Sequence, residues 1–539
     1  MSQTIRGADV LAGALARAGI GTVFTLSGNH IMPVFDALHG LPIDLIHTRH
    51  EAAAVHMADA HARLTDGVGI ALVTGGQGHT NAVAALTTAM AGEVPLVLLS
   101  GHAPLNEIGL GAFQELDNAA LAAPVTKAAW AARSAATLGD DLAHAIRTAR
   151  GGRPGPVHLS LPTDVLEAHV DAAGIAWPSV AAFEPSPMPL APEAAVTIRA
   201  AIAAARRPLV IAPPALCTPR GAALLAGLRA ALGVPVVPME SPRGINDPSL
   251  GAFAECLARA DLIVLLGKAL DFTLRFGRAP AVAAECRWII IDPDTARTPP
   301  EPPILTAAAG PCEAAAALSL GTPMASHADW AAEVAAAIDH RPAAWEARRG
   351  TPAGPIHPVT LCDALQPWLT RDPHSVLVCD GGEIGQWAQA LLTAPARAIN
   401  GVAGAIGSAI PFAIAARRAR PDATVLAVLG DGTFGFHMAE FDTAFRHRLP
   451  FVAVVGNDGA WNAEHQIQLR DYGADRAHGC LLAPATRYDL VASVLGGHGE
   501  FVTEAAALAP ALARAFASGL PACVNVLIEG QAAPVVRRG

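Results

Sequence analysis

The chain has 539 residues, of which 52% are hydrophobic and only 16% charged, so it is long and apolar enough for three or four domains with large buried cores. Its formal net charge is −10 and it has no run of Lys or Arg, which argues against nucleic acid as a partner. Gly, Pro or charged residues interrupt every apolar stretch well before about 18 positions, so we expect no membrane-spanning helix.

The eight cysteines are scattered along the chain and form no C-x-x-C pair. The N-terminus lacks the charged and then apolar pattern of a signal peptide. We therefore expect free thiols in a reducing compartment and a cytoplasmic protein.

The first part of the chain alternates short apolar runs with Ala-rich stretches. The runs 21–26, 43–47, 68–74 and 96–100 are predicted as buried strands, and most of them end in a polar loop that contains Gly. This alternation is typical of a doubly wound α/β domain, which we place at residues 1–170. The carboxyl ends of parallel strands meet at one edge of a sheet, so the polar loops are expected to form a binding edge.

Two Pro-rich, aperiodic segments divide the remainder, and we interpret residues 171–192 and 336–356 as linkers. Between them, residues 193–335 again alternate apolar runs with helical stretches, and residues 357–539 do so a third time. The sequence therefore predicts three doubly wound parallel-sheet α/β domains.

The most informative stretch is 425–461. Its two apolar runs, 425–429 and 451–455, are predicted as strands. The connection between them is predicted as one amphipathic helix, because apolar side chains recur at helical spacing. These side chains are Met438, Phe441 and Phe445.

Oxygen-bearing side chains follow both of these strands. Asp431 stands between two glycines after the first strand, and Asn457 and Asp458 follow the second. Carboxylate oxygens from adjacent strand ends suit Mg²⁺, which usually shares its ligand shell with phosphates. Glycines allow backbone N–H groups to approach a diphosphate closely. The alternative is an acidic loop without a ligand.

This Gly-Asp-Gly motif with its following Asn-Asp pair resembles the signature of thiamine-diphosphate (ThDP) dependent enzymes. Near the N-terminus, RHEAAAVHMADAHAR, GIALVTGGQGHTNAVAAL, PLVLLSGHAP and FQELDNAALAAPVTK resemble the acetolactate synthase and benzaldehyde lyase branch. The resemblance covers essentially the whole chain and implies the ThDP-binding fold of the pyruvate oxidase type. Two positions depart from the family pattern, with Asp458 in place of Asn and Gln77 in place of Pro.

The resemblance also implies a set of cofactor contacts in residues 357–539. Asp431, Asp458 and the backbone carbonyl of Ala460 would hold Mg²⁺. Ile406 would be the apolar wedge that bends ThDP, and the carbonyl of Gly404 would accept from its amino group. The alternative for Ile406 is an ordinary core residue. Asn457 would contact the diphosphate or hold its loop. The remaining implied contacts are Gly382, Glu383, Ile384, Gly430, Gly432 and Thr433.

Three residues near the N-terminus match catalytic positions of the family. Glu51 would interact with the aminopyrimidine ring of ThDP, whereas on spacing alone it would be a Glu at a helix N-terminus. His30 matches a His credited with proton transfer, for which histidine is suited near neutral pH. Gln114 matches a Gln that faces the cofactor. The alternatives are a cap or surface His and a polar helix start. Four nearby histidines lack zinc-ligand spacing and are expected in loops or at the surface, namely His47, His50, His56 and His61.

These matches favour a ThDP- and Mg²⁺-dependent C–C lyase or carboligase that acts on 2-keto acids, aldehydes or 2-hydroxy ketones, like benzaldehyde lyase. The alternatives are an acetolactate synthase, a 2-hydroxyacyl-CoA or oxalyl-CoA lyase, and a non-catalytic scaffold with a ThDP fold. Many FAD-bearing relatives have a Gly-rich turn where this chain has Pro213-Pro214, which disfavours FAD without excluding it.

The predicted site also implies an assembly. Glu51 and Asp431 belong to different predicted domains, yet both would contact one ThDP. In the family, the cofactor lies between the first domain of one chain and the third domain of another. We therefore expect a homodimer or homotetramer with active sites at the subunit interface.

Overall fold

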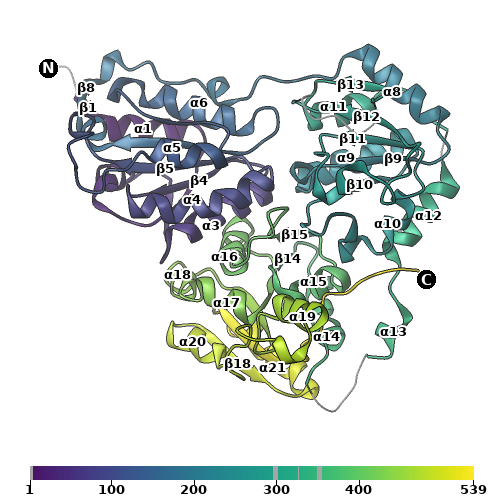
Figure 1. The fold of residues 1–539 in the computed structure, drawn as a ribbon. Coiled ribbons are helices and arrows are strands. Elements are labelled where there is room, and N and C mark those ends of the chain that lie inside the picture. The colour runs from purple at the N-terminus through teal and green to yellow at the C-terminus, as the bar shows by residue number, and fades with distance from the viewer. Residues whose placement is uncertain (1–3, 295–301, 326, 349–354, 539) are drawn as a thin grey trace. The chain divides into compact units, whose positions relative to one another are not determined.

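A computed structural model describes residues 4–294, 302–325, 327–348 and 355–538 (Figure 1). The chain divides into two compact units, Met1–Pro187 and Met188–Gly539. Three parallel sheets of six, five and six strands confirm the predicted α/β class. Among the described residues, no helix combines the length and apolarity that crossing a membrane requires. All eight cysteines are free thiols, as expected.

The first unit contains a six-stranded sheet with the order β3-β2-β4-β5-β7-β6, in which every pair is parallel. The four predicted strands are all present in it. The strands are β2 Thr22–Thr25, β3 Asp44–His47, β4 Gly69–Val73, β5 Leu96–His102, β6 Ala129–Ala131 and β7 Pro156–Pro162. The helices are α1 Gly7–Arg17, α2 Met32–Ala37, α3 Glu51–Thr65, α4 Gln77–Ala91, α5 Asn118–Ala122, α6 Leu138–Arg150 and α7 Thr163–Glu167.

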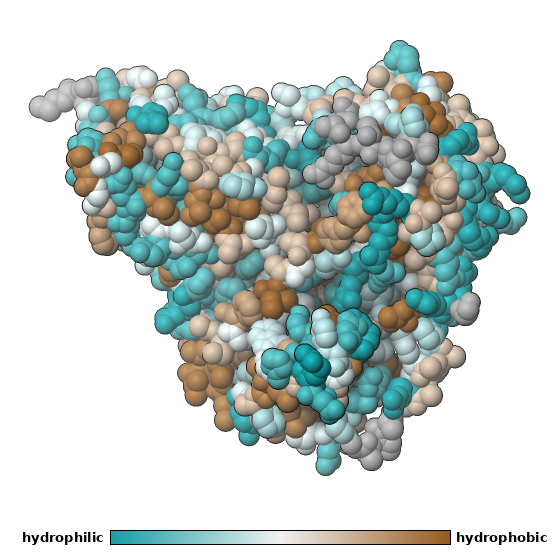
Figure 2. All heavy atoms as spheres, in the orientation of Figure 1, coloured by the Kyte–Doolittle hydropathy of each residue, from teal (hydrophilic) through white to brown (hydrophobic). Residues whose placement is uncertain are grey.

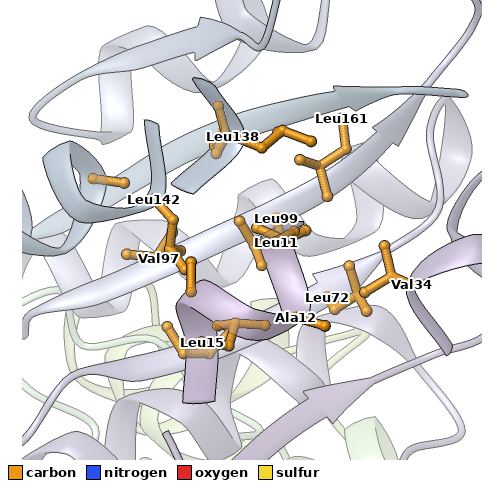
Figure 3. Packing of buried hydrophobic residues seen from close by; sticks show 14 of the residues in the cluster. Leu11, Ala12, Leu15, Val34, Leu72, Val97, Leu99, Leu138, Leu142 and Leu161 are labelled. Atoms are coloured by element: carbon orange, nitrogen blue, oxygen red, sulfur yellow. The ribbon is translucent and has the colours of Figure 1, made fainter. Parts of the chain in front are cut away.

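The core of this unit forms where α1 packs on one face of the sheet. Leu11 and Leu15 are four positions apart and therefore lie on the same side of α1. They meet Leu72, Leu99 and Leu161 from three neighbouring strands (Figure 3). Alternate strand residues point to the same face, so the apolar alternation places these side chains together.

The middle sheet has the order β10-β9-β11-β12-β13 and is also parallel. Ile263 and Val264 are adjacent on β11, yet they belong to two different buried clusters, because a strand alternates its side chains between faces. The strands are β9 Pro208–Ala212, β10 Val236–Pro238, β11 Leu262–Leu266, β12 Arg287–Ile291 and β13 Leu305–Ala307. The helices are α8 Pro192–Ala204, α9 Pro219–Leu232, α10 Phe253–Leu257, α11 Pro311–Leu318, α12 Ala328–Asp339 and α13 Ala343–Glu346.

The C-terminal sheet has the order β15-β14-β16-β17-β19-β18. Counted along the chain, both six-stranded sheets follow the order second, first, third, fourth, sixth and fifth, so they share one architecture. The strands are β14 Val376–Cys379, β15 Ala396–Ile399, β16 Val425–Gly430, β17 Val452–Asn457, β18 His498–Val502 and β19 Ala522–Leu527. The helices are α14 Pro358–Thr370, α15 Gly382–Leu391, α16 Ala409–Ala419, α17 Asp431–His437, α18 Glu440–Arg446, α19 Asn462–Asp471, α20 Tyr488–Val494 and α21 Leu508–Ala517.

The connection between β16 and β17 differs from the single amphipathic helix that was predicted. It consists of two short helices, α17 and α18, with a break between them. Phe441 is buried, but Met438 and Phe445 are exposed. The helical spacing of these three side chains therefore did not predict which of them the fold buries.

The predicted linkers contain more structure than their composition suggests. In 171–192, Phe183 packs into the core of the first unit. The strand β8, His169–Asp171, pairs antiparallel with β1, Thr4–Arg6. In 336–356, the chain first completes α12 and then forms α13. Residues 349–354 lie outside the described part. The domain boundaries themselves stay a prediction.

Candidate cofactor and metal site

The carboxyl edge of the C-terminal sheet collects the acidic residues of the predicted site. Asp380 follows β14, Asp431 follows β16 and Asp458 follows β17. The strand order reverses at β14, which lies between β15 and β16. Connections leave such a point in opposite directions and open a crevice, where parallel α/β sheets bind their ligands.

A cavity of about 310 Å³ lies at this edge. It is lined by every residue of the C-terminal part that was predicted to contact cofactor or metal, except Asn457. The predicted residues that line it are Gly382, Glu383, Ile384, Gly404, Ile406, Gly430, Asp431, Gly432, Thr433, Asp458 and Ala460. Segments that are far apart in sequence therefore share one wall.

The carboxylates of Asp431 and Asp458 both line this cavity and lie close enough to repel each other. Asp431 is 3% exposed and accepts hydrogen bonds of 3.0 Å from the backbone N–H groups of Gly432 and Gly459. Burial raises its pKa to about 6. The pKa of Asp458 is raised to about 7, first by burial and then by the negative charge of Asp431. A divalent cation bound by both carboxylates would offset the cost of burying like charges together, so this donor set suits Mg²⁺.

The glycines of the cavity leave backbone accessible. Gly382 has φ +78°, and a Cβ there would have no neighbour nearer than Gly430, whose Cα would lie 3.8 Å away. A Cβ on Gly430 would itself meet only the Ile384 side chain, at 3.9 Å. Side chains at these two positions would fill the cavity, whereas glycine keeps the N–H groups open to an anion such as a diphosphate. The residues present therefore fit ThDP with Mg²⁺.

Asn457 faces away from this cavity. Its side-chain nitrogen donates to the carbonyl of Thr486 at 3.0 Å and to the Asn525 side-chain oxygen at 3.1 Å. Of the two roles considered from the sequence, this geometry matches holding the loop rather than contacting the diphosphate.

In the first unit, Glu51 is the first residue of α3 and is buried. The side-chain nitrogen of Asn81, on α4, donates to its Oε2 at 3.0 Å. A Cβ on Gly78 would lie only 3.2 Å from Oε1, so the backbone of Gly78 packs closely against the carboxylate. Glu51 is thus oriented by a neighbouring helix and is not simply a solvated residue at a helix N-terminus.

His30 and Gln114 lie around the same segment, residues 74–78, which includes the start of α4 and approaches Glu51. His30 is buried, and its Nδ1 lies 3.1 Å from Thr74 Oγ1. Burial lowers the pKa of His30, so the neutral ring is favoured. Gln114 occupies a turn before α5 rather than a helix start, and its side-chain nitrogen donates to Gln77 Oε1 at 3.2 Å. The three predicted catalytic side chains therefore cluster around one glycine-rich segment at the start of α4.

One histidine expectation was wrong. His56 is buried on α3 instead of lying in a loop or at the surface. Nearly every face of this Ala-rich helix is covered, so residues on any side of it are removed from solvent.

Several residues around the site were not singled out from the sequence. Asn81 reaches Glu51 across 30 positions, and Arg243 lies 3.4 Å from the Glu383 carboxylate across 140 positions. No local spacing signals such pairs. Asp380 stands two positions before Gly382 in the sequence, but no sequence pattern assigned it a role.

Comparisons with known proteins identify the family. Residues 5–121 match "Thiamine pyrophosphate enzyme, N-terminal TPP binding domain", and residues 380–526 match the corresponding C-terminal TPP binding domain. The chain is 33% identical over 537 residues to a "Probable acetolactate synthase" of Mycobacterium bovis, which covers 98% of this chain and 96% of that protein. The chain therefore belongs to the ThDP-dependent enzymes.

Within this family, the chain is similar to proteins with two different names. The "Acetolactate synthase large subunit IlvG" of Mycobacterium tuberculosis is 33% identical over 98% of this chain and 96% of its own length. The "2-hydroxyacyl-CoA lyase 2" of Bos taurus is 32% identical over 548 residues, which cover 92% of this chain and 85% of that protein.

Proposed function

We propose that this chain is a ThDP- and Mg²⁺-dependent C–C lyase or carboligase that acts on 2-keto acids, aldehydes or 2-hydroxy ketones, in the manner of benzaldehyde lyase. The observation that carries the proposal is the cavity in which the Asp431 and Asp458 carboxylates stand beside open glycine backbone. A non-catalytic scaffold would have no need to bury two like charges at such a cavity.

The side chains divide the work. Asp431, Asp458 and the Ala460 carbonyl would hold Mg²⁺, and the N–H groups near Gly382 and Gly430 would bind the diphosphate. When bound, ThDP supplies the electron sink that lets a C–C bond beside a carbonyl carbon break or form. Ile406 would be the apolar wedge that bends ThDP, and the carbonyl of Gly404 would accept from its amino group.

Glu51 and His30 are the residues that would transfer protons. The Glu51 carboxyl group would share a proton with the pyrimidine ring, and the hydrogen bond from Asn81 fixes its orientation. His30 is neutral near pH 7 because burial lowers its pKa, so it can accept a proton from a substrate hydroxyl group. Gln114 would face the cofactor, as its match to the family implies.

The active site is completed by a second copy of the chain, which supplies Glu51 from its first domain. Exposed apolar side chains support such an assembly, since large apolar patches mark interaction surfaces. Around α20, Figure 2 shows hydrophobic side chains gathered at the surface, where Leu490 and Val494 are exposed. Phe436 and Phe445, on the neighbouring helices α17 and α18, are exposed as well. The assembly is a homodimer or a homotetramer.

A second candidate is a 2-hydroxyacyl-CoA lyase, and one cavity favours it. This cavity, of about 750 Å³, is lined by Arg243, Arg275 and Arg278, whose guanidinium groups suit the phosphates of a CoA substrate. The name of the bovine relative agrees with that chemistry. An acetolactate synthase is the alternative that the mycobacterial names support.

FAD is disfavoured by the packing at the carboxyl edge of the middle sheet. A Cβ on Gly267, which follows β11, would lie 2.8 Å from Pro311 Cβ and 3.4 Å from Pro213 Cγ. Proline side chains therefore occupy the space at the carboxyl ends of β9 and β11, where the strand order of the middle sheet reverses and a ligand would bind. Pro213 and Pro214 also offer no N–H to a phosphate.

The test has two steps. Titration of ThDP with Mg²⁺ should raise the melting temperature and produce the circular-dichroism bands of bound cofactor; no binding would contradict every enzyme reading. A panel of pyruvate, acetoin, benzoin and a 2-hydroxyacyl-CoA then separates the reactions. Cleavage of benzoin or acetoin supports chemistry like that of benzaldehyde lyase. Turnover of pyruvate alone narrows the proposal to an acetolactate synthase, and turnover of the CoA ester alone supports the second candidate.

A further inference from the structure

Asp380 joins two segments that line the candidate site. It follows β14, has no exposed surface and places its two carboxylate oxygens on different partners. Oδ1 accepts from the backbone N–H of Gly381 at 2.5 Å. Oδ2 accepts from the N–H groups of Gly407 at 2.8 Å and Ala409 at 3.0 Å. One buried carboxylate therefore ties the end of β14 to the chain just before α16.

These hydrogen bonds hold the chain next to Ile406, which precedes Gly407 in the sequence and lines the cavity. Its other neighbour is also tied, because the Asn400 side-chain nitrogen donates to the carbonyl of Ala405 at 2.8 Å. In addition, His437 Nδ1 lies 2.7 Å from the carbonyl of Gly407. Both peptide groups that flank Ile406 are thus anchored to other segments.

Gly381 shows how closely the two segments approach. A Cβ at this position would lie 2.3 Å from Ile406 Cγ2, so only glycine allows the contact. The adjacent pair therefore has two complementary effects: Gly381 lets Ile406 come close, and Asp380 keeps it there.

The chemistry of this clamp requires a carboxylate. Burying the group raises its pKa to about 6, a cost that an apolar side chain would avoid. Three N–H donors on two oxygens offset that cost. An asparagine has one acceptor oxygen, so it could serve only one of the two sides and would turn N–H groups against N–H groups on the other.

We propose that Asp380 is a positioning residue that holds Ile406 and the neighbouring Gly404 carbonyl at the cavity wall, so that the loop 400–408 is set in place before the cofactor binds. The inference rests on the proposed function for the role of Ile406, but the clamp itself belongs to the cofactor-free protein.

The first experiment needs no cofactor. Hydrogen–deuterium exchange is compared for wild type, Asp380→Asn and the control Asp372→Asn. Asp372 also accepts two backbone N–H bonds, from His374 and Thr424, but it precedes β14 at the opposite end of the strand. We expect exchange in peptides covering Gly407 and Ala409 to accelerate about tenfold or more in Asp380→Asn alone. Unchanged exchange there would overturn the proposal.

The second experiment uses the protein saturated with ThDP and Mg²⁺. Asp380→Asn should bind ThDP within about threefold of wild type, because the metal and diphosphate contacts are intact, while exchange of the ThDP C2 proton slows at least about tenfold. Ile406→Ala should slow it similarly, and the double variant should be no slower than the slower single variant. Additive effects would show that Asp380 does not act through Ile406 and would overturn the proposal.

The two experiments separate this inference from the proposed function. Failure of wild type to bind ThDP would refute the proposed function, while the exchange of the loop amides would still decide whether Asp380 clamps the loop. Should Asp380→Asn melt before the assay temperature, Asp380→Ser replaces it, since the smaller side chain keeps one acceptor and the same acceleration is expected.

Discussion

The backbone N–H of Gly459 donates a hydrogen bond of 3.0 Å to the carboxylate of Asp431. This bond joins the ends of two adjacent strands, because β16 and β17 pair with Gly430 opposite Gly456. The register therefore carries Asp458 and the Ala460 carbonyl to the side of Asp431, although 27 positions separate the two acids.

Replacing Asp458 with Asn should preserve or improve the binding of Mg²⁺ and ThDP. The amide keeps an oxygen ligand and removes a charge that Asp431 repels, as the raised pKa of Asp458 indicates. Isothermal titration calorimetry at pH 7.5 should give an affinity equal to or higher than that of wild type. Asp458→Ala is the matched control and should weaken binding about tenfold or more, since it removes the ligand. A clear loss in Asp458→Asn would speak against the assignment.

Glu51→Gln should bind ThDP nearly as well as wild type but slow exchange of the C2 proton about a hundredfold, because an amide cannot share a proton with the pyrimidine ring. Proton NMR after rapid mixing with D₂O measures this rate. Glu107→Gln, on an exposed turn of the same unit, serves as control and should exchange normally. Exchange at the wild-type rate in Glu51→Gln would remove Glu51 from the mechanism.

The proposed subunit interface predicts complementation. Coexpression of Glu51→Gln chains with Asp431→Asn chains produces mixed dimers in which one site takes both intact residues. Random pairing makes half of the dimers mixed, each with one intact site of two, so about a quarter of wild-type C2–H exchange is expected. Each variant alone should show almost none. No recovery in the mixture would mean that both residues come from one chain.

Stability of the first unit should depend on pH through His79. Its ring is buried against Ser100 and His158, and burial lowers its pKa from 6.5 to about 4. The unfolded chain therefore binds the proton more tightly, and the contribution of His79 to stability is present above pH 6.5 and lost as the pH falls towards 4. The full shift corresponds to about 3 kcal/mol.

Thermal melts test this dependence. Between pH 7.5 and pH 5, the melting temperature of wild type should fall more than that of His79→Gln, because the variant has no imidazole ring to protonate. His144→Gln is the comparison, since His144 lies at the exposed side of α6. Parallel pH profiles for wild type and His79→Gln would contradict the expectation.

Local pattern was sufficient for much of the fold. The runs that became β2, β4, β16 and β17 were recognisable because apolar strands in a parallel sheet are short, continuous and followed by polar loops. The same pattern failed between β16 and β17. There Met438 and Phe445 have helical spacing, but the connection is divided into the two short helices α17 and α18, and both side chains are exposed.

For the site, motif spacing indicated Asp431, Asp458 and the glycines beside them, since this chemistry restricts which residues can serve. Glu51 was named only through the resemblance to ThDP-dependent enzymes, because its spacing alone is that of a Glu at a helix N-terminus. Their surroundings depend on contacts that span long distances along the chain. The bond from Asn81 to Glu51, the bond from Asn457 to Thr486 and the clamp from Asp380 to Gly407 all arise from strand order and register. The spacing of residues along the chain does not predict such partners, because they come together only when the sheets form.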